Sequence, residues 1–140
     1  LAGIDYLRAI RDGRFPAAPI ARLLGFSLVE VEEGRAVFAV QPAEHHYNPI
    51  GLVHGGLLAT VLDSAMGCAV HSTLATGGAY TTLEIKVNFT RPVRMDSGLL
   101  RCEAKIVHRG KQTATAEGVV RDEQGRVCAH GTTRCCVMAG

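Results

Sequence analysis

Two polar residues, His54 and Asp63, stand nine positions apart in a segment that otherwise holds mainly small and apolar residues. The segment starts with a turn at Asn48 and passes through the step His54-Gly55-Gly56 into a run that favours an α-helix. A helix N-terminus presents N–H groups without partners and a partial positive charge. Because Gly55 and Gly56 leave their N–H groups sterically open, they could donate to an oxygen that gains negative charge, while His54 binds or orients the same group.

An apolar stripe after the glycines predicts a helix over residues 54–73. At about 100° per residue, Asp63 projects about 140° from the centre of this stripe, on a face shared with Gly56, Thr60 and Gly67. A lone acid among small residues is atypical of a solvated helix surface, so this face should be approached closely by another group. The apolar residues recur with the spacing of one helical face, at positions 57, 58, 61, 62, 65, 66, 69 and 70.

His54 and Asp63 cannot serve the same substrate atom within one chain. Nine residues of helix correspond to a rise of about 13.5 Å and about half a revolution. A second copy of the chain could bring its own Asp63 to the first copy's helix N-terminus, and a two-fold dimer would then hold two shared sites. If the two residues cooperate, the spacing predicts a homo-oligomer.

The other segments predict a sheet around this helix. Residues 1–24 are typical of an N-terminal helical segment, and residues 26–32 and 35–40 of a β-hairpin. We predict an α+β fold, a single domain over residues 1–140, in which this hairpin and a four-strand antiparallel meander form a curled sheet around one long central helix. The four later strands are expected at about 80–90, 98–108, 112–121 and 127–137.

Composition excludes several classes of protein. With 47% hydrophobic and 20% charged residues in 140, the chain is typical of one globular domain. A net charge of +2 and the absence of Trp argue against a nucleic-acid-binding protein. No run of 18 apolar residues could span a membrane, and the first residues lack the layout of a signal peptide. Five cysteines, an odd number without a Cys-x-x-Cys motif, indicate a reducing cytoplasm rather than a disulfide framework.

The spacing of Asn48, Gly51, the His54-Gly55-Gly56 step and Asp63 resembles that of hot-dog-fold acyl-CoA thioesterases. The similarity is closer to the branch that includes phenylacetate-pathway and 4-hydroxybenzoyl-CoA-type enzymes. Segments 87–92 and 109–111 and the inferred strand order also look similar, so that the resemblance covers residues 20–138. It implies a hot-dog fold, assembled as a dimer or a dimer of dimers. The implied activity is hydrolysis of an acyl- or aryl-acyl-CoA to free acid and CoA, without a metal or redox cofactor.

The resemblance also implies roles for single residues. Asp63 would be the general base that activates water against the thioester carbonyl, or the nucleophile itself. The Gly55 N–H would form the oxyanion hole, with Asn48 and His54 orienting the thioester. A hydroxyl near the start of the next strand would help to place the water. Thr82 fits this role better than Thr81 when the strand is counted back from residues 87–89.

CoA carries a pyrophosphate and a 3′-phosphate, which call for basic residues at the mouth of the site. Arg91, Arg109 and Lys111 lie in expected turns, and in the family the Arg-Gly-Lys turn region lies near the nucleotide. We therefore assign Arg91, Arg109, Lys111 and the backbone of Gly56 to binding of the substrate or its CoA moiety. The other interpretation of residues 109–111 is a plain exposed hairpin.

Each site residue has a simpler interpretation. Asp63 could be a solvated acid or the partner of an arginine, His54 a helix cap, and Asn48 the start of a turn. The adjacent His45 and His46 suggest a metal, but neighbouring side chains on an extended chain point in opposite directions, and no third ligand stands at a useful spacing.

Two other functions remain open from the sequence. An enoyl-thioester hydratase or dehydratase would keep the fold, but those enzymes place an acid–base His with Asp, Asn or Glu in differently spaced motifs. A non-catalytic acyl-CoA-binding module would bind the ligand tightly without turnover.

Overall fold

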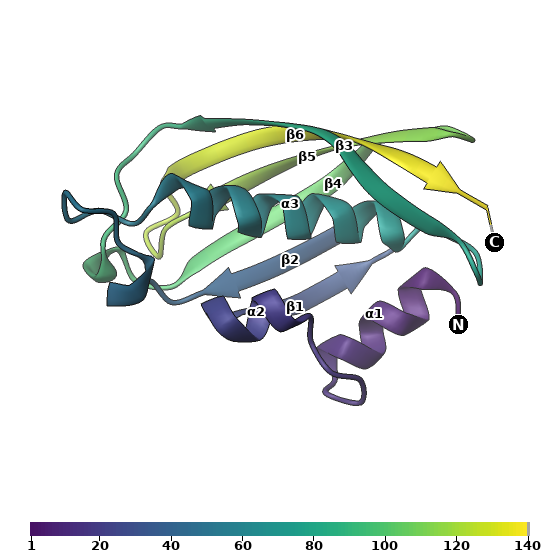
Figure 1. Cartoon of the computed structure of the whole chain (residues 1–140), viewed down its shortest axis with the longest axis horizontal. Helices are drawn as coiled ribbons and strands as arrows, with labels where there is room; N and C mark the ends of the chain where they lie inside the picture. Colours follow the sequence, from purple (N-terminus) through teal and green to yellow (C-terminus); the bar gives the residue numbers. More distant parts are fainter. Residues whose placement is uncertain (140) are drawn as a thin grey trace.

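The computed structural model describes residues 1–139 and shows one six-stranded antiparallel sheet curled around a long helix, α3 (Figure 1). This arrangement confirms the predicted α+β fold. The sheet does not close, because its two edge strands do not pair with each other. The elements are α1 (Gly3–Arg11), α2 (Pro19–Leu24), β1 (Phe26–Glu32), β2 (Arg35–Val40), the 3-10 turn η1 (Glu44–His46), α3 (Gly55–His71), β3 (Ala79–Phe89), the 3-10 turn η2 (Met95–Ser97), β4 (Leu100–Arg109), β5 (Thr113–Arg121) and β6 (Val127–Met138).

The apolar stripe of α3 forms the centre of the core. All eight of its predicted positions are buried, and Leu62 and Met66 have no exposed surface. The stripe packs on β2, β4 and β5. Because the sheet covers only one side of the helix, the side that carries Asp63 stays partly accessible.

The strand order corrects one prediction. The order is β1-β2-β4-β5-β6-β3, so the meander has three strands and the predicted four-strand meander is wrong. β3 pairs with β6 at one edge, and β4 pairs with β2. The reason is the long connection after Phe89, which contains η2 and passes the N-terminal end of α3, where the N–H of Val53 donates to the carbonyl of Val93 at 2.8 Å. A two- to five-residue hairpin turn could not make this crossing.

The N-terminal segment forms two helices, as predicted, and both lie beside β1 (Figure 1). The Gly3 N–H donates to the Leu74 carbonyl at 3.0 Å, just beyond the C-terminal end of α3. A Cβ at position 3 would lie 1.9 Å from the His71 carbonyl oxygen, so only glycine permits this contact. The start of the chain is therefore held against α3.

Helix α3 is the longest helix, with 17 residues. Within residues 1–139 no helix combines the length and the apolar character needed to cross a membrane. The five cysteines all carry free thiols, three of them buried and Cys68 and Cys136 half-buried.

Candidate active site

The N-terminus of α3 has one backbone donor occupied and one open. His54 is the N-cap, and its Nδ1 accepts the N–H of Gly56 at 2.7 Å. The prediction that Gly56 leaves its N–H open to a ligand is therefore wrong, because the cap satisfies this donor. The N–H of Gly55, the first helical residue, finds no acceptor among residues 1–139. His54 acts here as the helix cap, the simpler of its two interpretations.

Gly55 lies on a surface groove together with two other predicted residues. The groove has a volume of about 390 Å³, and Asn48, Gly55 and Arg91 all line it. Phe89 forms its wall at the glycine, because a Cβ at position 55 would lie 3.0 Å from the edge of the Phe89 ring. Sequence reasoning missed Phe89 as a site residue, although the family resemblance of segment 87–92, which contains Phe89, was the signal that could have indicated it. The absent side chain at Gly55 leaves the open N–H next to the groove.

Asn48 uses its side-chain oxygen to hold the turn before α3. Its Oδ1 accepts the N–H groups of Ile50 at 3.0 Å and Leu52 at 3.1 Å. This is the turn-starting role of asparagine. The side-chain amide nitrogen donates to no acceptor within residues 1–139, so Asn48 could still offer this donor to a ligand in the groove.

Asp63 lies half-buried on α3 and is held by a threonine of β3. The Thr82 hydroxyl donates to Oδ1 of Asp63 at 2.9 Å. Asp63 makes no ion pair with any lysine or arginine of residues 1–139. Thr81 is exposed and makes no such bond. Of the two predicted hydroxyl residues, the structure therefore brings Thr82 to Asp63. The arginine-partner interpretation of Asp63 does not hold for the described chain.

Two neighbours of Asp63 are kept neutral by burial. Burial raises the pKa of the Cys68 thiol to about 12, with a smaller contribution from the Asp63 carboxylate. Burial also raises the pKa of Tyr80, with smaller contributions from Cys68, Cys135 and Asp63. Since the thiolate is the reactive form of cysteine, Cys68 is not a candidate nucleophile.

The small-residue face of α3 is approached closely, as predicted. At one end of this face the approaching group is a side chain of the same chain. At Gly67 a Cβ would lie 2.8 Å from the Tyr80 hydroxyl oxygen, so Tyr80 covers that end of the face. Gly56 remains exposed, and Thr60 and Asp63 are half-buried. Thr60 and Asp63 line a shallow depression together with Ile20, Ala59, Ser64 and Ile85.

Asp63 and Gly55 do not meet within one chain. The Asp63 depression and the Gly55 groove have no lining residue in common. Both residues belong to α3, and the eight-residue separation corresponds to a rise of about 12 Å. The open N–H of Gly55 and the carboxylate of Asp63 therefore lie on two separate surfaces of one chain.

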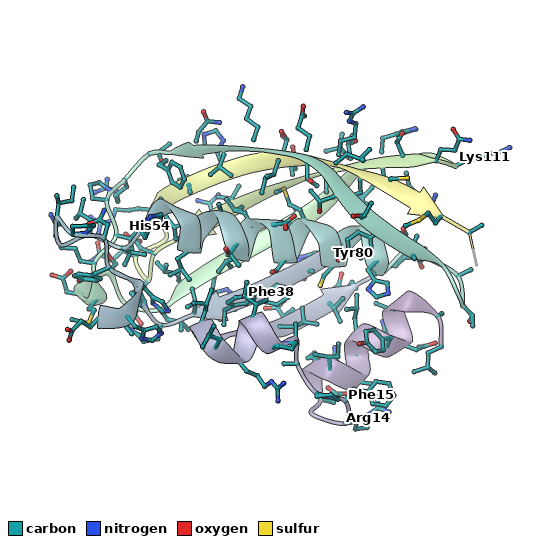
Figure 2. The ribbon with its side chains drawn as sticks, viewed as in Figure 1. Arg14, Phe15, Phe38, His54, Tyr80 and Lys111 are labelled. Carbon is teal, nitrogen blue, oxygen red and sulfur yellow. The ribbon has the colours of Figure 1, made fainter. Side chains whose placement is uncertain are left out.

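The predicted basic residues separate into two places. Arg91 lines the Gly55 groove, whereas Arg109 and Lys111 lie beyond the C-terminal end of α3, beside residues 74–78. Figure 2 shows His54 and Lys111 at opposite ends of the molecule. Within one chain Arg109 and Lys111 therefore lie far from Arg91, because the β4–β5 turn lies at the end of the sheet where α3 ends.

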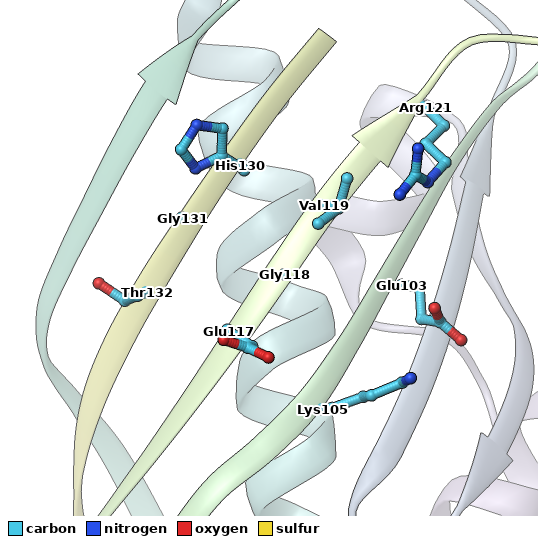
Figure 3. Close-up of a pocket in the computed structure, with 9 residues that line it drawn as sticks. All are labelled: Glu103, Lys105, Glu117, Gly118, Val119, Arg121, His130, Gly131 and Thr132. Atoms are coloured by element: carbon cyan, nitrogen blue, oxygen red, sulfur yellow. The ribbon is translucent and has the colours of Figure 1, made fainter. Parts of the chain in front are cut away.

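A further hollow, of about 410 Å³, lies on the outer face of the sheet. Its walls carry both signs of charge, with Glu103, Glu117, Lys105 and Arg121 around it (Figure 3). In this view α3 lies behind the strands, so the sheet separates the hollow from Asp63. None of the predicted site residues lines it.

Known proteins are similar to this chain in sequence and in fold. The family model described as the thioesterase superfamily matches residues 50–129. The proofreading thioesterase EntH of Klebsiella pneumoniae is 30% identical over 105 residues, which cover 75% of each chain. Human acyl-coenzyme A thioesterase 13 is 26% identical over 127 residues, 89% of each chain. The crystal structure of a phenylacetic acid degradation-related protein from Ralstonia eutropha JMP134 is similar with a TM-score of 0.84 and 28% identity, covering 94% of this chain and 98% of that one.

Proposed function

The chain belongs to the thioesterase superfamily and is a thioester hydrolase with the hot-dog fold, and from this premise we propose that it hydrolyses an acyl- or aryl-acyl-CoA with Asp63 and Gly55 as catalytic residues. In the reaction, the oxygen of water ends on the carbonyl carbon of the acyl group and the C–S bond breaks. The CoA sulfur leaves and takes up a proton. A catalyst must therefore supply a base or nucleophile and stabilise the carbonyl oxygen as it gains charge.

The single observation that carries the proposal is the environment of Asp63. It is half-buried, accepts a hydrogen bond from Thr82, and has no cation beside it in residues 1–139. A structural acid on a helix surface is usually solvated or paired with a lysine or arginine. Thr82 holds Oδ1, so that Oδ2 is left for the reaction.

Asp63 can act in either of two ways. As a general base, Oδ2 takes a proton from the water that attacks the carbonyl carbon. As a nucleophile, Oδ2 attacks that carbon itself, displaces the CoA thiolate and forms an anhydride, which water then opens. Both routes need the same carboxylate in the same place.

The open N–H of Gly55 is the proposed oxyanion donor. It lies at the positive end of α3, where the helix dipole also favours negative charge. Asn48 and His54 support this arrangement, since Asn48 holds the preceding turn and His54 caps the helix. Arg91, on the same groove, is placed to attract a phosphate of CoA.

Bringing Asp63 and Gly55 into one active site requires a second copy of the chain. β3 is an edge strand that pairs only with β6 within residues 1–139, and it exposes the apolar side chains of Leu83, Ile85 and Phe89. A long apolar edge invites pairing with another chain. Two-fold pairing through this edge would place two α3 helices side by side in opposite directions, so that Asp63 of one chain approaches Gly55 of the other. The same reversal would carry Arg109 and Lys111 of one chain toward the groove of the other.

The proposal is tested by free-thiol release from a panel of acyl-CoAs. We expect turnover of several thioesters by the wild type and a fall of at least about 10²-fold in kcat for Asp63→Asn. The matched control is Asp96→Asn, an exposed acid in η2, which should leave kcat unchanged. Thiol release from none of the thioesters would contradict the function. Tight binding without turnover, unaffected by Asp63→Asn, would identify a binding module instead.

A further inference from the structure

A pocket that is more enclosed than the Asp63 depression lies under the N-terminal helices, next to Asp63 along α3. It has a volume of about 160 Å³ and twelve lining residues. Helix α1 contributes Leu7 and Ile10, the connection before α2 contributes Ala17, and β2 contributes Phe38. Figure 2 labels Phe38 and Tyr80, which enter this region from β2 and β3. None of the twelve side chains carries a formal charge at neutral pH.

The pocket adjoins the Asp63 depression at one residue. Ser64 lines both, and Cys68 lines the pocket one helical turn further along α3. A thioester whose carbonyl lies at Asp63 could therefore extend its acyl group past Ser64 into the pocket. This step rests on the function proposed above.

The walls of the pocket belong mainly to a part of the chain that the family model does not cover. Nine of the twelve lining residues precede residue 50, where the match to the thioesterase superfamily begins, and three follow it. The N-terminal segment is held in place by the bond from Gly3 to Leu74 and by ring contact of Tyr6 with His71, at 5.6 Å between centroids. The shape of the pocket is thus set largely by the chain's own residues before position 50, in the N-terminal segment and in β1 and β2.

Size and polarity limit what the pocket can hold. An apolar protein cavity of about 150 Å³ binds one benzene molecule. Phe26 and Phe38, two of the lining residues, meet edge to face with 5.7 Å between ring centroids, and aromatic walls suit an aromatic guest. A carboxylate would lose its hydration here without gaining a cation partner. A long alkyl chain would exceed the volume.

We propose that this pocket receives the acyl group of the thioester and limits it to an uncharged group about the size of one six-membered ring, with Ile10 and Ala17 as the residues that set the limit. Single-ring aryl-acyl and short alkyl-acyl thioesters are then the substrate class. Long-chain and dicarboxylic acyl thioesters are excluded, the first by volume and the second by charge.

The test compares kcat/KM for acetyl-, hexanoyl-, benzoyl-, phenylacetyl-, succinyl- and palmitoyl-CoA. We expect the wild type to favour benzoyl- or phenylacetyl-CoA over palmitoyl- and succinyl-CoA by at least about tenfold. Ala17→Phe, which fills the pocket, should lower the ratio of benzoyl- to acetyl-CoA turnover by about tenfold or more. Ile10→Ala enlarges the pocket and should raise the ratio of hexanoyl-CoA to benzoyl-CoA turnover. Ile4→Ala is the matched control, because Ile4 lies on the same helix and packs on the core without lining the pocket.

A second measurement needs no turnover. Toluene, added to the wild type, should shift the NMR methyl signals of Leu7 and Ile10, and Ala17→Phe should abolish these shifts. A preference for palmitoyl-CoA, or equal ratios in Ala17→Phe, Ile10→Ala and Ile4→Ala, would overturn the inference and leave the proposed function standing. Failure to cleave any thioester would overturn the proposed function and with it the acyl assignment. In that case toluene binding would still decide whether the pocket accepts a ring.

Discussion

The hydroxyl of Thr82 donates a 2.9 Å hydrogen bond to Oδ1 of Asp63, which joins edge strand β3 to the exposed side of α3. The strand has a bulge immediately after this threonine, where the pairing with β6 shifts between Thr82 and Glu84. Bulges redirect side chains and are common beside active sites. The bond fixes one carboxylate oxygen, and in the function proposed above the other oxygen acts on a water or a thioester carbon.

Replacing Thr82 with Val should reduce kcat about 10- to 100-fold, because a hydrogen bond to a charged group contributes about 1.5–3 kcal/mol. KM should change little if the bond mainly positions the carboxylate. Steady-state thiol release over a range of substrate concentrations measures both constants. Thr82→Ser should recover most of the lost activity, and Thr81→Val, at the exposed neighbour, should behave as the wild type. Equal losses in Thr81→Val and Thr82→Val would contradict this role.

Replacing Gly55 with Pro should remove the proposed oxyanion donor while preserving the helix. Position 55 is the first residue of α3, where proline is favoured. The added ring would approach Phe89, so the reference is Gly55→Ala, which introduces the same Cβ and keeps the N–H. We expect kcat of the proline variant to be about 10²- to 10³-fold below that of the alanine variant. Similar kcat values for the two, with equal circular dichroism, would argue that Gly55 is no donor in the reaction.

Acid should weaken the fold partly through Asp122 in the β5–β6 turn. Burial raises the pKa of this carboxyl, but hydrogen bonds from the backbone and guanidinium of Arg126 and from the Gln124 N–H outweigh it, and the net pKa is lowered. Because the pKa of Asp122 is lower in the folded state than its unfolded value of about 3.9, its charged carboxylate stabilises the fold at pH values above about 3.9. This stabilisation disappears as the pH falls through the folded-state pKa.

Asp122→Asn should therefore lower Tm by about 3 °C or more at pH 7, and the difference should shrink toward zero near pH 2. Thermal unfolding followed by circular dichroism at several pH values measures this. Asp96→Asn, at an exposed acid with no such bonds, serves as the reference. A Tm difference that does not depend on pH would show that Asp122 stabilises the fold through the shape of its side chain and not through its charge.

Local features of this fold could be predicted from the sequence, whereas contacts between distant segments could not. The eight apolar positions of α3 depend on residues close in the chain, and periodicity predicts them well. The place of β3 beside β6 depends on a crossing after Phe89 that no short-range pattern specifies. For this reason the four-strand meander was the wrong prediction.

The same distinction applies to the candidate site. The resemblance could suggest Thr82, but only the register of β3 against α3 shows that its hydroxyl reaches Asp63. The sequence could not show that Arg109 and Lys111 lie far from Arg91 within one chain, because it does not tell which end of the sheet carries the β4–β5 turn. The occupied N–H of Gly56 depends on the rotamer of His54, which residue type alone leaves open.

Mixed dimers can decide whether the active site is shared between chains. One chain would carry Asp63→Asn and keep Gly55, and the other would carry Gly55→Pro and keep Asp63. If each site combines Gly55 of one chain with Asp63 of the other, a mixed dimer holds one intact site and one with both defects. If both residues of a site came from one chain, every site in the mixture would be defective.

Random mixing should make about half of the dimers mixed, so activity should recover to about a quarter of the wild-type value. Thiol release before and after co-refolding of equal amounts of the two variants measures the recovery. Each variant refolded alone provides the baseline, and two different affinity tags allow the mixed dimers to be isolated, where recovery should reach about half. Isolated mixed dimers with no activity above the baseline would refute the shared site. Because α3 separates Gly55 from Asp63 in every single chain, recovery can come only from a neighbour that supplies the missing residue.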